Sequence, residues 1–115
     1  FSNYGVILQS IGKLQEAESL YRKAIDLKPD YAEAHSNLGI ILKDLGKLEE
    51  AELSQRKAIE LKPDLANAYY LLSLILSKSN EHKEALSMID QSLIYDPNNH
   101  LYQGEKQRIE FLLSM

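Results

Sequence analysis

The stretch AEAHSNLGIILKDLGKLEEAELSQRKAIELKPDL, residues 32–65, is the most informative part of the chain, because much of it occurs twice. When residues 1–34 are aligned with residues 35–68, 21 of the 34 positions are identical. A degenerate third copy follows, since residues 69–99 are identical to residues 35–65 at six of 31 positions. A fixed period of this length is typical of solenoid proteins, in which each unit buries its apolar face against its neighbours.

Each unit has the pattern of two helices joined at a tight turn. In residues 32–65, Gly46 separates two runs with helical spacing of apolar residues, and Pro63 ends the second run. Glycine readily adopts the positive φ that such a turn requires. Gly12 holds the same place in the first unit and Asn80 in the third. We therefore expect helix pairs that turn at all three positions.

Small residues recur where two helices have to approach closely. One repeat position holds Gly5, Gly39 and Ser73, and another holds Ala17, Ala51 and Ala85. A larger side chain at these places would force the helices apart. Asp30 and Asp64 follow the prolines of the first two units, and we expect them to cap the next helix.

Residues 32–65 resemble a tetratricopeptide repeat at its signature places. The matching residues are Leu38, Gly39, Leu42, Ala51, Ala58 and Pro63. The resemblance implies an all-α fold, a right-handed superhelical solenoid of antiparallel helix pairs. Gln55 departs from the pattern, because the family usually has an aromatic residue there.

The resemblance also implies how the chain divides. Residues 1–31 would form a first repeat that lacks its N-terminal part, 32–65 a second, and 66–99 a degenerate third. Residues 100–115 do not match a fourth repeat but keep an apolar face, which is typical of the helix that caps a solenoid. Because the chain begins at Phe1, we interpret it as a piece of a longer protein whose open N-terminal end favours self-association.

Members of the family usually bind a peptide in a concave groove lined by the first helix of each repeat. The residues that map to this groove are Asn3, Val6, Ser36, Asn37, Ile40, Lys43, Asn67, Tyr70, Leu71 and Leu74. An asparagine amide both donates and accepts, so Asn3 and Asn37 are suited to hold the backbone of an extended peptide. This resembles the asparagine ladder of O-linked N-acetylglucosamine transferases. The alternative is a solvated amide on a helix surface.

A second family mode, the clamp for chaperone C-termini, requires lysine, arginine and asparagine at set places. Those places here hold Ser2, Val6, Asn37, Asn67 and Leu71, and only Asn37 fits. The sequence therefore predicts no such clamp and no fixed cation in the groove to pair with a carboxylate.

Composition excludes several classes of function. A net charge of -4 and a pI of about 5.3 argue against nucleic acid as a partner. The longest apolar run, YYLLSLIL at 69–76, is too short to span a bilayer, so no membrane association is expected. The absence of cysteine is compatible with a reducing compartment, and we expect a cytoplasmic protein.

No pattern indicates catalysis. The three histidines, His35, His82 and His100, are scattered and form no metal-binding pair, and there is no phosphate loop or nucleophile motif. We predict no catalytic residue, metal or cofactor. The expected function is a protein-interaction module that binds an extended peptide or a partner helix. The alternatives are a self-associating structural scaffold and the substrate-recruiting arm of a transferase with its catalytic domain outside this chain.

Overall fold

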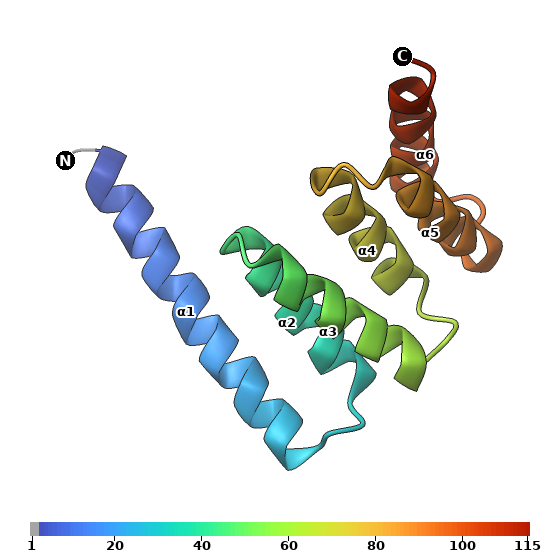
Figure 1. Ribbon diagram of the computed structural model, residues 1–115. Helices are drawn as coiled ribbons and strands as arrows, with labels where there is room; N and C mark the ends of the chain where they lie inside the picture. The colour runs from blue at the N-terminus through green and yellow to red at the C-terminus, as the bar shows by residue number, and fades with distance from the viewer. Residues whose placement is uncertain (1–2) are drawn as a thin grey trace.

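The computed structural model describes the backbone of residues 3–115 and the side chains of residues 10–115. Within that part of the chain, every regular element is an α-helix, which confirms the all-α prediction (Figure 1). The helices are α1 (Asn3–Leu27), α2 (Ala32–Asp44), α3 (Leu48–Leu61), α4 (Ala66–Lys78), α5 (His82–Tyr95) and α6 (His100–Leu113). None of these helices is both long and apolar enough to cross a membrane.

The helices keep the 34-residue period of the sequence. α2, α4 and α6 begin at residues 32, 66 and 100, and α3 and α5 begin at residues 48 and 82. Each helix packs against the next one along the chain, and α2 also contacts α4. α1 lies at one end of the array and α6 at the other (Figure 1). The last helix therefore takes the place of the first helix of a fourth repeat and covers the end of the solenoid, as predicted for a capping helix.

The turns at Gly46 and Asn80 have the predicted left-handed conformation. Gly46 has φ +82° and Asn80 has φ +62°. In each case the next residue donates its backbone N–H to a carbonyl near the end of the preceding helix. Lys47 bonds to Leu42 at 2.8 Å and Glu81 to Leu76 at 2.9 Å, which is the pattern of a Schellman motif.

The prediction of a third turn at Gly12 is wrong in this structure. α1 runs without interruption from Asn3 to Leu27, and a Cβ on Gly12 would meet nothing within 4 Å. Local sequence does not explain the difference, because residues 12–18 and 46–52 differ only at Gln15 and Glu49. The reason lies in packing. α2 has neighbours in α1, α3 and α4, whereas a separate helix before Gly12 would lie at the edge of the array with fewer contacts.

The conformation at Gly12 can be tested by alanine substitution. In a continuous helix, Gly12→Ala is expected to raise the free energy of unfolding by about 0.5–1 kcal/mol, since alanine has the higher helix propensity. Gly46→Ala is the matched control and should lower it by about 1–2 kcal/mol, because a Cβ is strained at positive φ. Urea denaturation followed by circular dichroism measures both changes. A loss at Gly12 equal to that at Gly46 would show that the chain turns there.

Two buried clusters form the core. One comprises Leu38, Leu42, Ala51 and Ile75, and the other comprises Leu72, Leu76, Ala85, Ile89, Tyr102 and Ile109. Ala51 and Ala85 have no exposed surface, as expected for positions where helices approach closely. Ser73 is also fully buried, while the contacts of Gly5 lie outside the described residues. Each large aliphatic side chain removed from water contributes about 1.5–3 kcal/mol to stability before entropy is counted.

The prediction that Asp30 and Asp64 cap helices is wrong. The N-cap residues of α2 and α4 are Tyr31 and Leu65, which make no side-chain capping bond. Both aspartates lie one residue too early, because a backbone turn places the next residue at the helix start. Among α2 to α6, α6 alone has a capping side chain at its N-cap, where Asn99 accepts from the backbone N–H of Tyr102 at 3.2 Å.

A side chain in the first turn of α2, α4 and α6 ties each helix to the proline before it. His35, Tyr69 and Gln103 bond to the carbonyl oxygens of the prolines six residues upstream, each at 2.9 Å. These three residues are again 34 positions apart. The His35 ring therefore makes the bond that the Tyr69 hydroxyl makes in the next repeat.

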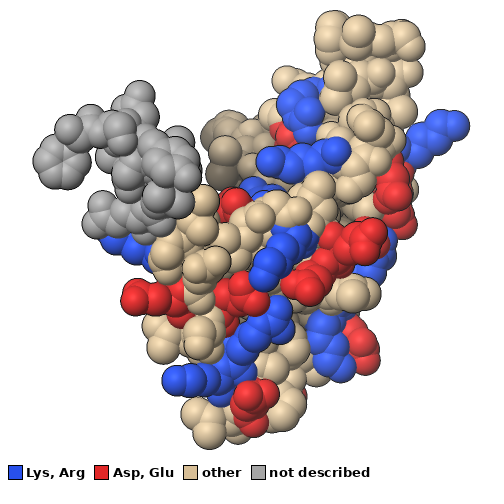
Figure 2. Space-filling model, turned by 60° about the vertical axis from the view of Figure 1, so that its left-hand side comes forward, with Lys and Arg blue, Asp and Glu red and all other residues tan. Residues whose placement is uncertain are grey.

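Charged side chains connect successive repeats. Lys47 bonds to Glu18 at 3.2 Å, and Arg56 bonds to Glu84 at 3.1 Å. Figure 2 shows basic and acidic side chains interspersed over the visible face. Such exposed pairs contribute little stability, about 0.2–1 kcal/mol each. That face has no broad region of positive charge of the kind that binds nucleic acid.

Candidate functional site

The first helices of the repeats lie side by side and form one surface of the molecule. The Tyr70 ring of α4 lies 5.0 Å from the Tyr102 ring of α6, and Arg108 of α6 bonds to Ser77 of α4. We call this surface the inner face and define it by the accessible or half-accessible side chains of Asn37, Ile40, Lys43, Leu74, Lys78 and Arg108. It is the surface to which the sequence assigned the groove.

Four of the predicted groove residues lie on the inner face. Asn37 is exposed, and its amide makes no hydrogen bond with the side chains or backbone of residues 10–115. Ile40, Lys43 and Leu74 are half-buried. Lys43 and Leu74 line a common cavity with Arg108 of α6. These side chains offer one amide, one cation and two apolar groups to a ligand.

Two predicted groove residues are buried, and their assignment to the groove was wrong. Ser36 is only 5% exposed and donates to Gln55 Oε1 of α3 at 2.9 Å. Leu71 is only 7% exposed. Ser36 lies at the edge of the helical stripe chosen from residue spacing, and a helix of 3.6 residues per turn carries such a position into the contact with the neighbouring helix. Leu71 holds the same repeat position as the exposed Asn37, so its place on the helix does not account for its burial.

Asn67 and Tyr70 are engaged by the capping helix. The Tyr102 hydroxyl donates to Asn67 Oδ1 at 3.4 Å, and Tyr70 packs on the Tyr102 ring. Burial raises the pKa of Tyr70 and of Tyr102, so both hydroxyl groups stay protonated at neutral pH. The side chains of Asn3 and Val6, also predicted for the groove, lie outside the described residues.

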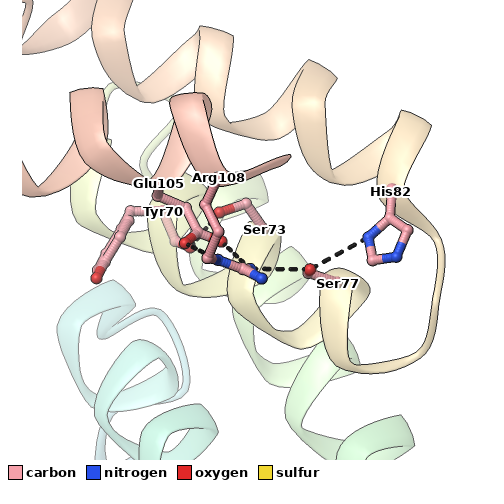
Figure 3. Close-up of polar contacts among 6 residues, drawn as sticks. All are labelled: Tyr70, Ser73, Ser77, His82, Glu105 and Arg108. Carbon is pink, nitrogen blue, oxygen red and sulfur yellow. Dashed lines mark hydrogen bonds and ion pairs between the residues drawn. The ribbon is translucent and has the colours of Figure 1, made fainter. Parts of the chain in front are cut away.

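Residue spacing alone missed a polar network centred on Arg108. Its guanidinium donates to both carboxylate oxygens of Glu105, from Nε at 2.8 Å and from Nη2 at 2.6 Å (Figure 3). Nη2 also donates to Ser77 Oγ at 2.9 Å, and Ser77 lies 3.2 Å from Nδ1 of His82. The bond to Glu105 raises the pKa of Arg108, which stays charged. Extending the repeat register would have found Arg108, because it lies 34 residues after Leu74.

This network corrects the expectation that the groove holds no fixed cation. Arg108 is held at two sides by Glu105 and Ser77, and it shares a cavity with Lys43 and Lys78. None of the three cations occupies a place of the chaperone-tail clamp considered above. Arg108 belongs to α6, the helix predicted as a cap, which therefore also contributes a charge to the inner face.

The side chains described in residues 10–115 show no arrangement suited to a metal. No group of three or more histidine or acidic side chains is placed to bind an ion there. His35 bonds to Pro29 and His82 to Ser77, so both rings have structural partners.

Models of the tetratricopeptide repeat match most of the chain. One, described as a tetratricopeptide repeat, matches residues 32–65 and 66–99, and another, described as a TPR repeat, matches residues 5–46. The chain belongs to the tetratricopeptide repeat family. The two matched repeats of this tetratricopeptide protein coincide with the helix pairs α2–α3 and α4–α5.

Solved tetratricopeptide domains have the same fold. The first TPR of Spaghetti (RPAP3) bound to the HSP90 peptide SRMEEVD has a TM-score of 0.87 and 24% identity, over 97% of this chain and 89% of that one. The Arabidopsis OM64 TPR domain has a TM-score of 0.84 and 21% identity, over 92% and 88%. The O-GlcNAc transferase mutant of Thermobaculum terrenum has a TM-score of 0.81 and 23% identity, over 88% of this chain but 19% of that one. A search of curated protein sequences found no match.

Proposed function

We propose that this tetratricopeptide chain is a protein-interaction module that holds an extended peptide or a partner helix on its inner face. The observation that carries the proposal is the composition of that face. Three adjacent helices present apolar side chains at Ile40 and Leu74, cations that the fold leaves accessible, and the Asn37 amide, which makes no hydrogen bond with residues 10–115. The fold itself makes little use of these groups, whereas a peptide has amides, apolar side chains and charges that match them.

The structural comparison supports the same reading. The similar RPAP3 domain is described as bound to a peptide, and that peptide is a short linear segment. At 24% identity this likeness concerns the fold alone, and it transfers no particular ligand to the present chain. Since the chain shows no catalytic arrangement in its described part, we propose recognition without chemistry, so that any transferase activity would belong to another domain.

A peptide-library selection tests the proposal. Asn37→Ala is expected to lower the affinity for the enriched peptides about fivefold, because an amide that hydrogen-bonds to both sides of a peptide unit contributes about 1 kcal/mol to binding. Asn98→Ala is the matched control, since Asn98 is also exposed but lies in the turn between α5 and α6. It should leave the affinity unchanged. Binding at the inner face is contradicted if the selection enriches no peptide. It is also contradicted if Asn37→Ala and Asn98→Ala lower the affinity for the enriched peptides equally.

Self-association is the second candidate, favoured by exposed apolar side chains on α1. Leu20 is 66% exposed and Leu27 is 88% exposed, and they are seven residues apart on one side of the helix. Light scattering over a range of protein concentrations distinguishes the two functions. A self-associating scaffold is supported if the apparent molecular mass of the wild-type protein rises with concentration, if the mass is lower in Leu20→Gln/Leu27→Gln, and if the selection enriches no peptide.

A further inference from the structure

The inner face contains one cavity in which three helices contribute positive charge. Its volume is about 330 Å³, and its lining residues are Lys43 of α2, Leu74, Ser77 and Lys78 of α4, and Arg108 of α6. No other helix contributes to this lining. The cavity therefore forms only where the second repeat, the third repeat and the capping helix meet.

Arg108 is oriented by the fold but not fully used by it. Nε and Nη2 donate to Glu105, which is only 8% exposed, and Nη2 also donates to Ser77. Nη1 donates to no atom of residues 10–115, and the Arg108 side chain is 48% exposed. A guanidinium has five N–H donors in a planar fork, so the two on Nη1 have no acceptor among residues 10–115. Figure 3 shows the Arg108 side chain between Glu105 and Ser77.

The two lysines leave positive charge at the same place. Lys43 is half-buried, and its nearest carboxylate, that of Asp44, is 3.9 Å away. Lys78 is exposed and forms no ion pair with any residue in the described part of the chain. By contrast, Arg22 of α1 and Lys47, the N-cap residue of α3, pair closely with Glu18, at 2.9 Å and 3.2 Å. With Asp44 and Glu105 counted against three cations, the cavity retains a net positive charge in a chain whose own net charge is -4.

We propose that this cavity binds a carboxylate side chain of an acidic peptide segment, an inference that rests on the peptide-binding function proposed above. The Nη1 donors of Arg108 and the two ammonium groups pair with the carboxylate, and Leu74 contacts the aliphatic stem of the acidic residue. The cavity thus selects a negatively charged side chain of the peptide, while Asn37 on the neighbouring α2 surface is suited to bind the peptide backbone. The ligand is thereby narrowed to peptides with aspartate or glutamate at one fixed position.

Two peptide libraries with the same apolar positions test this inference, one with Asp and Glu and the other with Asn and Gln at the remaining positions. We expect the wild-type protein to enrich the acidic library and to bind acidic peptides about tenfold more tightly than their amide counterparts. Lys43→Gln/Lys78→Gln should abolish this preference. Lys57→Gln/Lys83→Gln is the control, because it removes the same charge from exposed positions of α3 and α5 and should retain the preference.

The outcomes separate this inference from the function on which it rests. One outcome would overturn the carboxylate site and leave peptide recognition intact. In that outcome, peptides from the amide library bind as tightly as peptides from the acidic library, and their affinity falls in Asn37→Ala but not in Lys43→Gln/Lys78→Gln. If both double-lysine variants lose the preference for acidic peptides equally, the carboxylate site is also overturned, because the preference would then depend on the overall charge of the protein. If neither library is enriched, both the recognition function and the carboxylate site are contradicted.

Discussion

Replacing Gly39 by valine is expected to lower the free energy of unfolding by about 2–4 kcal/mol, through overpacking and the loss of a buried hydrogen-bond pair. A Cβ at Gly39 would lie 2.6 Å from Nε2 and 3.0 Å from Cδ of Gln55. Gln55 is fully buried, so its side chain cannot move aside without losing its bonds to Ser36. Equilibrium denaturation in urea measures the change.

Gly104→Val is the matched control for this substitution. Gly104 is also inside a helix, but a Cβ there would meet nothing within 4 Å. Its replacement should change the stability by no more than about 0.5 kcal/mol, because only helix propensity is affected. If Gly39→Val proved as mild as the control, α2 and α3 would not pack as closely as described.

Removing the amide of Gln55 is expected to have the second large effect. Gln55 accepts from the Ser36 hydroxyl at 2.9 Å and donates to the Ser36 carbonyl at 2.8 Å. Gln55→Ala leaves a cavity and an unpaired hydroxyl, and we expect a loss of about 2–4 kcal/mol in the free energy of unfolding. Thermal and urea denaturation of the variant check this value.

A double-mutant cycle shows whether the Ser36–Gln55 contact itself is responsible. Ser36→Ala leaves Gln55 Oε1 without its donor while the bond from Nε2 to the backbone carbonyl remains, and Gln55→Leu leaves the Ser36 hydroxyl without its acceptor. The double variant removes both the hydroxyl and the amide oxygen, so that neither side-chain group is buried without its partner. The double variant should therefore be more stable than the sum of the single changes predicts, by about 1 kcal/mol or more. Strict additivity would mean that the two side chains do not interact in solution.

The 34-residue period predicted most of the fold. The positive φ at Gly46, its replacement by Asn80 and the burial of Ala51 all follow from local backbone chemistry repeated along the chain. The continuous course of α1 through Gly12 was not predictable in this way, since the same local sequence turns at Gly46. That difference depends on how many neighbouring helices each segment has.

The candidate site was predicted in outline but not in its chemistry. Spacing placed Asn37 and Lys43 on the inner face, but it placed Ser36 there as well. Ser36 instead bonds to Gln55 of α3, the residue that stands where the family usually has an aromatic side chain, and residue spacing within α2 gives no sign of this partner. Arg108 required the repeat register to be continued into a segment whose other residues no longer resemble a repeat.

The most direct test of peptide recognition at the inner face is a nuclear magnetic resonance titration of the ¹⁵N-labelled protein with the acidic peptide that the selection enriches most. The largest shifts are expected for the backbone amides of Asn37, Lys43, Ser77 and Arg108, with saturation at one peptide per chain. Shifts confined to the exposed sides of α3 and α5, for example at Lys57 and Ser87, would place the ligand elsewhere and contradict the account.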